Sequence, residues 1–274
     1  MIFHKTKEEI ELLRESSLLV SKTLAELAGH IKPGVSSLQL DKIAETFIRD
    51  HNGVPAFKGY RGFPNSLCTS VNAQIVHGIP NNDPLKEDDM ISIDCGIKLN
   101  GYYGDSAYSF ALSNISDEVE ALMAATKKSL FIGIEQAVIG KRIGDIGFAI
   151  QDYVEQKQGY HIVRELVGHG VGKSLHEDPE VPNYGKRGSG PKMIEGLVIA
   201  IEPMVNLGTR SVVQLSDGWT VKTADGSPSA HYELMVALQR GEADVLSTFS
   251  YIEEAEEKNK NLKPIVTTSV ILGN

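Results

Sequence analysis

Cysteine is scarce in this chain. Only Cys68 and Cys95 occur among its 274 residues, which is too few for a disulfide scaffold. No secretory leader, with a basic start, an apolar middle and small residues at its end, precedes them. We therefore expect a reducing, cytoplasmic environment.

Long apolar runs and an excess of basic charge are missing as well. Strictly apolar runs stay short, as at residues 197–201, whereas a membrane span needs roughly 18 residues. Lys and Arg (27) are fewer than Asp and Glu (36), and the formal charge of −9 disfavours a nucleic-acid surface. The sequence predicts neither a membrane nor a nucleic-acid partner.

What is present is typical of a folded protein. Hydrophobic residues make up 41% of the chain and charged residues 23%, which excludes disorder and a collagen-like fibre. At roughly 150 residues per domain, the length lies between one domain and two.

Helical and strand-like segments alternate twice along the chain. Apolar residues at three- and four-residue steps predict helices, and short β-branched runs between Gly, Pro and Asn predict strands. The predicted order is helices at residues 7–30 and 36–49, strands within 54–112, helices at 116–138 and 143–154, and strands within 160–238. This order favours an α+β fold and hints at an internal duplication, for which chance similarity is the alternative.

Two acidic residues lie in a predicted β-hairpin. Asp94 is near the end of one apolar strand, Asp105 lies in the next, and Asn100-Gly101 between them is the strongest short signal for a hairpin turn. With that turn Asp105 faces Gly96, so the two acids share a face as diagonal neighbours, roughly 7 to 8 Å apart at the backbone. Carboxylates that close repel each other unless a cation or a proton lies between them.

Two further acids interrupt apolar strands. Glu202 directly follows five apolar residues that are typical of a strand buried on both faces, and Glu233 lies near the start of a predicted strand at residues 232–238. Burying an unpaired carboxylate costs several kcal/mol. Each acid alone is more readily explained as a solvated or ion-paired strand end, but four acids in four apolar strands indicate a shared site.

A histidine lies between glycines in residues 168–172. The following residues 172–174 end like a phosphate-binding loop, but the first glycine of that motif is absent and Pro179 follows where the motif needs a helix. We therefore reject nucleotide binding. His169 is open to close approach because its neighbours lack side chains. His77 and His176 are further candidates, and for any one histidine a turn or core position is the alternative.

The charges of these residues can be balanced by metal ions. The four carboxylates carry −4, which two divalent cations neutralise, and His169 adds a nitrogen ligand. Two ions bridged by carboxylates, about 3.5 to 4 Å apart, form a hydrolytic site that lowers the pKa of a bridging water toward about 7. One nitrogen and no thiolate among five ligands favours Mn(II), Fe(II) or Co(II) over a structural zinc. Composition leaves the choice among these three open.

Together these motifs resemble those of type I methionine aminopeptidases. The likeness covers residues 5–240 and rests on His77-Gly78-Ile79-Pro80, Asp94 with Asp105, the glycine-flanked His169, His176-Glu177-Asp178-Pro179, Val181-Pro182-Asn183-Tyr184-Gly185, Ile201-Glu202-Pro203-Met204, and Glu233 after Ser229-Ala230. The resemblance implies the pita-bread fold, in which two pseudo-symmetric α+β halves surround a dimetal site. We expect one catalytic domain at residues 1–250, with halves at about 5–112 and 116–240, and leave the C-terminal tail, residues 251–274, unassigned.

The resemblance also implies a metal-binding role for each of the five ligands. Asp94 matches the chelating ligand of one metal, and His169 matches the nitrogen ligand of the other. Asp105 and Glu233 match the bridging carboxylates. Glu202 matches the residue that binds metal and is the base for the attacking water.

Substrate contacts are implied in the same way. His77 and His176 resemble the pair that touches the scissile amide and steadies the tetrahedral intermediate, which requires donors where negative charge develops. The methionine side-chain pocket is lined by residues matching Tyr60, Phe63, Cys68 and Trp219. An apolar, aromatic and sulfur-bearing lining suits a flexible thioether, with ordinary core packing as the alternative. Asn72 and Ser229 match positions near a monovalent-cation site.

Some positions depart from the family pattern. Phe57 and Phe63 stand where many members carry Cys and Tyr, and His231 and Leu234 replace Gln and His. By strand alternation His231 shares a face with Glu233, so we expect it to approach the metals or alter their surroundings. We expect the short bacterial form, without the N-terminal zinc-binding extension of eukaryotic cytosolic relatives.

The leading hypothesis is a monomeric cytoplasmic metalloaminopeptidase. It would remove the initiator methionine from nascent polypeptide N-termini whose second residue is small, in transient contact with the ribosome. One alternative is an X-Pro dipeptidase or aminopeptidase P, which usually has a longer N-terminal domain and lacks the Trp219 pocket. Another is a catalytically silent pita-bread binding protein, which loses metal ligands, whereas all five are present here.

Overall fold

The computed structural model describes residues 2–266 as a mixture of helices and antiparallel strands. The helices are α1 (Lys7–Ala28), α2 (Ser37–Asp50), α3 (Asp117–Ile134), α4 (Ile143–Gln151) and α5 (Ser250–Lys258), with a 3-10 turn η1 (Tyr60–Gly62) and a π-helical turn η2 (Asp152–Lys157). The strands are β1 (Val54–Pro55), β2 (Leu67–Val71), β3 (Gln74–Val76), β4 (Met90–Leu99), β5 (Tyr102–Ala111), β6 (His161–Ile162), β7 (Gly168–Gly170), β8 (Glu177–Val181), β9 (Val198–Ile201), β10 (Met204–Asn206), β11 (Val212–Gln214), β12 (Val221–Thr223), β13 (Ser229–His231), β14 (Leu234–Ala237) and β15 (Asp244–Val245).

Side-chain caps determine where the first three helices begin. The hydroxyl of Thr6 accepts a hydrogen bond from the N–H of Glu9, whose carboxylate accepts one from the N–H of Thr6. Ser36 and Gln39 repeat this capping box at α2, and Ser116 caps α3. The four predicted helices are confirmed, with ends shifted by a few residues and the fourth completed by η2.

The predicted hairpin is formed by β4 and β5. Gly96 pairs with Asp105 and Asp94 with Ala107, so the predicted register is confirmed and both acids lie on one face. The other edge of β4 pairs with β1 and β2.

A second antiparallel sheet, of order β15-β14-β9-β7-β8, carries the other candidate ligands. Every residue of β9 is buried, as the apolar run predicted. His169 lies in β7, Glu202 directly follows β9 and Glu233 directly precedes β14. Two smaller sheets have the orders β13-β10-β6 and β11-β12-β3.

The strands that carry the two glutamates are interrupted at the acids. Pro203 has no N–H to donate, and the chain breaks there between β9 and β10. On the opposite side, β13 pairs with β10 and β14 pairs with β9, so the chain changes its pairing partner between β13 and β14. In that gap the N–H of Glu233 donates to the carbonyl of Ala107 on β5 at 2.9 Å, which ties the two halves together. The strand predicted at residues 232–238 is therefore confirmed only for Leu234–Ala237.

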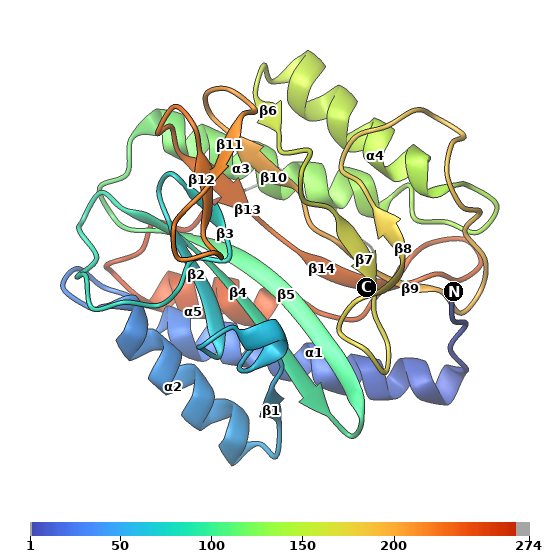
Figure 1. The fold of residues 1–274 in the computed structure, drawn as a ribbon, viewed down its shortest axis with the longest axis horizontal. Coiled ribbons are helices and arrows are strands. Elements are labelled where there is room, and N and C mark those ends of the chain that lie inside the picture. Colours follow the sequence, from blue (N-terminus) through green and yellow to red (C-terminus); the bar gives the residue numbers. More distant parts are fainter. Residues whose placement is uncertain (1, 267–274) are drawn as a thin grey trace.

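The helices cover the strands from two sides. Figure 1 shows α1 and α2 in the lower part of the view, alongside the lower end of the long β4–β5 hairpin, and α4 at the upper right. α1 packs on β4 and β5, and α3 packs on β9, β10 and β13. Each half of the chain thus contributes a helix pair outside and acid-bearing strands inside.

The first part of the C-terminal tail packs onto the domain. Helix α5 contacts α1, and the side chains of Leu262 and Ile265 are buried. Buried side chains of residues 252–265 therefore extend the core, which the sequence did not indicate. The remainder of the tail, residues 267–274, lies outside the described residues.

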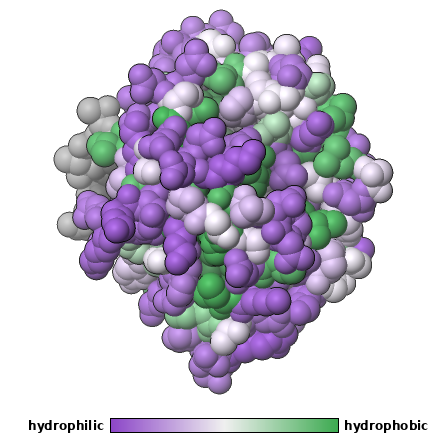
Figure 2. Space-filling view, turned by 90° about the vertical axis from the view of Figure 1, so that its left-hand side faces the viewer, coloured by the Kyte–Doolittle hydropathy of each residue, from purple (hydrophilic) through white to green (hydrophobic). Residues whose placement is uncertain are grey.

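Within residues 2–266, no helix is long and apolar enough to cross a bilayer. Figure 2 shows a mostly hydrophilic face with a strip of hydrophobic side chains near its centre.

Candidate metal centre

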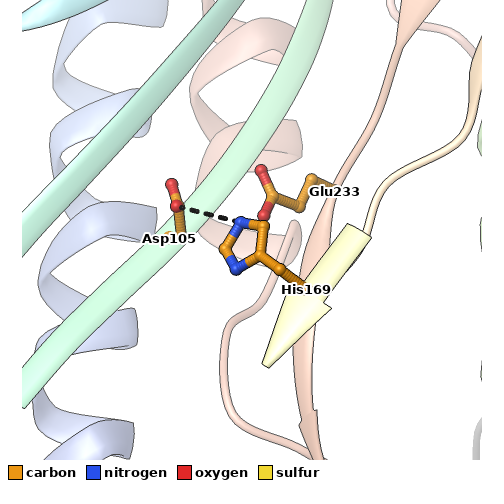
Figure 3. Close-up of side chains that lie close together, drawn as sticks. All are labelled: Asp105, His169 and Glu233. Carbon is orange, nitrogen blue, oxygen red and sulfur yellow. Dashed lines mark ion pairs between the residues drawn. The ribbon is translucent and has the colours of Figure 1, made fainter. Parts of the chain in front are cut away.

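The five predicted ligands line one cavity of about 420 Å³. Asp105, His169 and Glu233 offer ligand atoms that lie within 4.8 Å of one another (Figure 3). The Nε2 atom of His169 is 3.9 Å from Oδ2 of Asp105 and 3.6 Å from Oε1 of Glu202. Asp94 completes the cluster beside Asp105, with which its side chain interacts. Acids and a histidine that are far apart in the sequence therefore lie together in one cavity.

His169 presents a lone pair to these acids. Its Nδ1 lies 2.9 Å from the carbonyl of Gly170, and because a carbonyl only accepts, Nδ1 carries the proton. Burial lowers the pKa of His169, which keeps the ring neutral and leaves Nε2 as an acceptor. An acceptor that faces carboxylate oxygens requires a cation or a proton between them.

Asp105 and Glu233 are buried, Asp94 and Glu202 are partly buried, and within residues 2–266 none of the four forms an ion pair with Lys or Arg. Among the described residues, Oδ1 of Asp94, Oδ1 of Asp105 and Oε1 of Glu233 have no hydrogen-bond partner. Burial raises the pKa of Asp94 to about 7. Burial, followed by repulsion from neighbouring acids, raises the pKa of Asp105, Glu202 and Glu233 well above the usual range. An oxygen-rich donor set with one imidazole fits divalent ions, so the residues present fit the metals that the resemblance implies.

The glycines around His169 allow β7 to lie close to its neighbours. A Cβ at Gly168 would meet the carbonyl oxygen of Ala200 in β9, and a Cβ at Gly170 would meet that of Asp178 in β8. The glycine pattern is therefore required for packing, and this packing holds the imidazole against the acids.

His77 and His176 line the same cavity. The ring of His176 lies 4.2 Å from that of His169 between centroids, and its Nδ1 is 2.9 Å from the hydroxyl of Tyr60. Burial lowers the pKa of His176 to about 3 and also lowers the pKa of His77. The backbone of His77 has a φ of 58°, in the left-handed region, and Gly78 follows where a Cβ would meet the carbonyl of Thr69. Both rings are neutral and can donate a hydrogen bond into the cavity.

The residues predicted to line the side-chain pocket lie together at the apolar end of the cavity. Phe57, Phe63 and Cys68 are buried in one cluster, with Tyr60 and Trp219 packed against it. The rings of Phe63 and Trp219 meet edge to face with centroids 5.1 Å apart. Because Cys68 pairs with Asp94 across β2 and β4, the apolar pocket lies next to the acids.

The two departures near the last glutamate have different positions. The Nε2 atom of His231 lies 3.8 Å from Oε2 of Glu202, so this imidazole lies beside one of the acids, and its expected approach to the metals stays a prediction. Its burial lowers its pKa to about 3. Leu234 is buried in the main core and does not line the cavity.

Asn72 and Ser229 also lie close together. The N–H of Ser229 donates to the carbonyl of Asn72 at 3.0 Å. The side chain of Asn72 donates to Asp89 at 2.7 Å and accepts from the N–H of Met90 at 2.9 Å.

Sequence reasoning missed the residues that hold the acids in place. The amide of Asn183 donates to the carbonyl of Glu202 at 3.0 Å, and the hydroxyl of Ser106 donates to the carbonyl of Glu233 at 2.6 Å. Ser109 holds the carbonyl of His231 in the same way at 2.7 Å. For Ser106 and Ser109 the available signal was a small polar residue in a largely apolar strand, whereas Asn183 lay in the motif at residues 181–185 without an assigned role.

Comparison with known proteins covers these same segments. A model of metallopeptidase family M24 matches residues 11–239. The chain belongs to metallopeptidase family M24. As an M24 member it has the α+β pita-bread fold that the resemblance implied, and the family supports divalent metal ions as its cofactors.

Individual M24 relatives match this chain over nearly their whole length. A methionine aminopeptidase of Clostridium acetobutylicum is 52% identical over 248 residues, which is 90% of this chain and 99% of the relative. Methionine aminopeptidase 1 of Bacillus subtilis is 50% identical over 247 residues, with the same two coverages. The crystal structure of methionine aminopeptidase from Rickettsia prowazekii has a TM-score of 0.89 at 36% identity, covering 90% of this chain and 100% of that chain.

Proposed function

We propose that this chain is a methionine aminopeptidase, which hydrolyses the peptide bond after the N-terminal methionine of nascent proteins whose second residue is small. The observation that carries the proposal is the apolar pocket of Phe63, Cys68 and Trp219 directly beside the buried acids. A thioether side chain fits the pocket, and the scissile bond then lies at the carboxylates. The relatives matched over 99% of their length carry this activity in their names.

Within this site we assign Asp94 as the chelating ligand, His169 as the nitrogen ligand, Asp105 and Glu233 as bridges, and Glu202 as a ligand. When bound, two divalent ions, which we propose to be Mn(II), Fe(II) or Co(II), polarise the carbonyl and lower the pKa of water. The high pKa values that burial imposes on the free acids explain why they need such ions.

The residues of the chain divide the remaining tasks. Glu202 accepts a proton from the attacking water and passes it to the leaving amine, while Asn183 holds its backbone. His77 and His176 donate hydrogen bonds to the amide oxygen as negative charge develops there. Met204 and His231, paired across β10 and β13, line the cavity beside Glu202 and limit the space for the second residue.

Other features complete the proposal. We assign residues 1–250 to one catalytic domain with halves at about 5–112 and 116–240, and helix α5 adds to the core of this domain. We assign a monovalent cation to the neighbourhood of Asn72 and Ser229. We further propose that the protein acts as a cytoplasmic monomer that contacts the ribosome transiently.

Peptide cleavage tests the function directly. Metal-free protein is loaded in turn with Mn(II), Fe(II) and Co(II) and given Met-Ala-Ser, Met-Leu-Ser and Gly-Pro, with mass detection of the released residue. We expect methionine from Met-Ala-Ser with at least one metal, little from Met-Leu-Ser, and no glycine. Preferential cleavage of Gly-Pro would instead identify an X-Pro dipeptidase. Absence of turnover with every metal would favour a silent binding protein.

A further inference from the structure

One wall of the side-chain pocket has little regular structure of its own. We call residues 57–66 the rim loop; it connects β1 to β2 and carries Tyr60 and Phe63. Its backbone passes through left-handed φ values at Gly59 (85°), Arg61 (49°) and Gly62 (90°). A left-handed arginine is strained, so the loop keeps this shape only if its surroundings impose it.

The hydrogen bonds within the rim loop do not attach the loop to the rest of the protein. The N–H of Phe63 donates to the carbonyl of Tyr60 at 2.9 Å, and the N–H of Gly59 donates to the carbonyl of Phe63 at 2.8 Å. These bonds close the turn on itself. They leave its position relative to the sheet undetermined.

Asp41 of α2 holds the end of the rim loop. This residue is 4% exposed, and its Oδ1 accepts hydrogen bonds from the N–H groups of Ser66 and Leu67, both at 2.9 Å. Its Oδ2 accepts from the amide of Asn65 at 2.8 Å. Three donors in fixed directions give a charge-assisted contact that is stronger and more directional than a neutral one.

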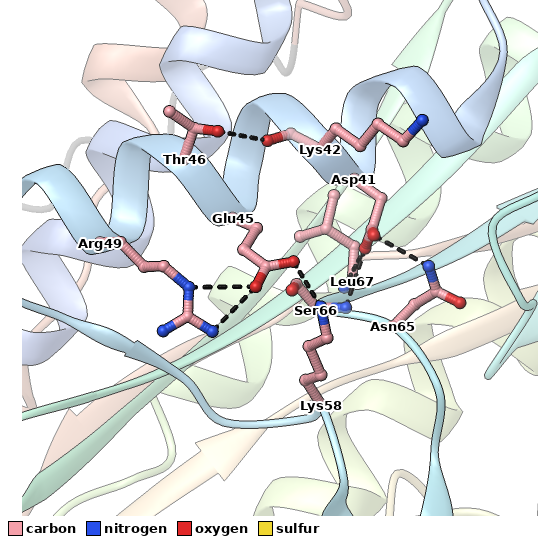
Figure 4. Close-up of polar contacts among 9 residues, drawn as sticks. All are labelled: Asp41, Lys42, Glu45, Thr46, Arg49, Lys58, Asn65, Ser66 and Leu67. Atoms are coloured by element: carbon pink, nitrogen blue, oxygen red, sulfur yellow. Dashed lines mark hydrogen bonds and ion pairs between the residues drawn. The ribbon is translucent and has the colours of Figure 1, made fainter.

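Glu45, one turn further along α2, holds the start of the rim loop. Its carboxylate accepts from Nζ of Lys58 at 2.6 Å and from Arg49 at 2.8 Å. Figure 4 shows Asp41 and Glu45 both extending from α2 toward the loop. Because the Glu45 pair is more exposed, it contributes less than Asp41.

The segment that Asp41 holds leads directly into the part of the pocket next to the candidate metal ligands. Leu67, the first residue of β2, donates its N–H to Asp41. The next residue, Cys68, faces the pocket and pairs with Asp94. A shift at this point therefore moves Phe63 and Cys68 relative to the acids without removing a ligand.

We propose that Asp41 is a positioning residue that sets the width of the pocket for the first side chain of the substrate, and so the discrimination between methionine and longer side chains. The proposal rests on the aminopeptidase function proposed above. Asp41 touches no part of the substrate and acts through the rim loop.

The test compares kcat/KM for Met-Ala-Ser with that for the same peptide carrying ethionine, which is one methylene longer. In Asp41→Ala we expect the preference for methionine to fall at least fivefold, through a higher KM for Met-Ala-Ser, with kcat changed less than twofold and the metal content unchanged. Asp41→Asn should keep the wild-type preference within twofold, because its amide oxygen still accepts from the two N–H groups. A ratio of two substrates is independent of the fraction of protein that is folded.

Ala44→Gly is the matched control. Ala44 is buried in the same helix and does not contact the rim loop by hydrogen bonds, so its replacement lowers the melting temperature and should leave the preference unchanged. If Asp41→Ala fails to fold, Asn65→Ala, which removes one of the three donors, should lower the preference about twofold.

The outcomes separate this proposal from the function on which it rests. An unchanged preference in Asp41→Ala, or in Asn65→Ala if the former does not fold, overturns the positioning role while the aminopeptidase stands. An equal loss of preference in Ala44→Gly overturns it too, since general destabilisation would then be the cause. A wild-type protein that releases no methionine refutes the function, and the positioning role with it.

Discussion

Glu202 faces two imidazoles, with Oε1 3.6 Å from His169 and Oε2 3.8 Å from His231. Both rings are neutral because burial lowers their pKa values, so neither neutralises the carboxylate. This arrangement leaves Glu202 free to exchange protons once cations compensate the neighbouring acids.

The base assignment predicts the effect of Glu202→Ala. General acid–base catalysis contributes about 10²- to 10⁴-fold, and a ligand is lost as well, so we expect turnover of Met-Ala-Ser to fall by at least about 10³-fold. Steady-state kinetics after reconstitution with metal measures this fall in turnover. Glu195→Ala, at an exposed position, is the control. Near-normal activity of the reconstituted variant would exclude Glu202 as the base.

The ligand assignment of His169 predicts a stoichiometry. Its Nε2 is the single nitrogen among the proposed ligands, so His169→Ala should lower the bound divalent metal from two equivalents to one after dialysis. Elemental analysis measures the content, and the exposed His161→Ala serves as the histidine control. Two equivalents retained in His169→Ala would contradict the assignment.

At the scale of elements, α5 shows how a segment that the sequence left unassigned enters the core. Nζ of Lys127 in α3 is buried and lies 2.9 Å from the hydroxyl of Tyr108 on β5 and 3.0 Å from the carboxylate of Glu253 on α5. The hydroxyl of Tyr108 donates to Glu256 of α5 at 2.7 Å. This buried cluster attaches α5 to the strand that carries Asp105.

Glu256 predicts a pH dependence of stability. Burial raises its pKa from 4.5 to about 7, so the folded protein holds a proton that the unfolded chain has released between these values. The stabilisation is complete below pH 4.5 and is lost as the pH rises through 7, and 2.5 pKa units correspond to about 3 kcal/mol. Glu256→Gln should therefore gain stability relative to wild type between pH 5 and pH 8, measured as the difference in urea midpoints. Parallel pH profiles for the two proteins would refute the prediction.

Element boundaries show how far local patterns extend. Apolar residues at three- and four-residue steps predicted the first three helices, and the structure shows that their starts depend on local caps at Thr6, Ser36 and Ser116, which are contacts between residues three apart. Asn100-Gly101 revealed the β4–β5 register for the same reason. The break before Leu234 was missed, since it depends on Pro203 and on Ala107, which are distant in the sequence.

At the scale of the whole molecule, the two halves meet at a cluster of like charges. Unfavourable burial of four acids is tolerable in the folded protein only if protons or cations compensate it. Ions that bind this cluster therefore link the halves and stabilise the fold.

Metal binding should raise the thermal stability. Mn(II) at a hundredfold excess over its dissociation constant adds about 2.7 kcal/mol, which raises the melting temperature by roughly 5 to 10 °C. The increase should be smaller at pH 5.5 than at pH 7.5, because protons compete for acids whose pKa values are raised, that of Asp94 to about 7. Differential scanning calorimetry with and without a chelator measures both effects. A melting temperature that does not respond to metal would contradict a metal site between the halves.

Local and chemically rare patterns were legible in the sequence itself. It showed the helices, the hairpin, the four acids in apolar strands and the glycine-flanked His169. An acid or a glycine in an apolar strand destabilises the strand, so its presence indicates a functional or packing role. The α+β fold followed from the order of helices and strands, and the combined motifs gave the resemblance to type I methionine aminopeptidases, which the match to family M24 supports.

Only the tertiary structure decided how distant segments meet. It joined Glu233 to β5 through Ala107 and Ser106, attached α5 through Lys127, and bound the rim loop to Asp41. Each of these contacts joins residues far apart in the chain, and a polar side chain gives no local sign of which distant group it will bind. The identity of the candidate ligands could therefore be predicted from the sequence, whereas the supports that position them required the folded chain.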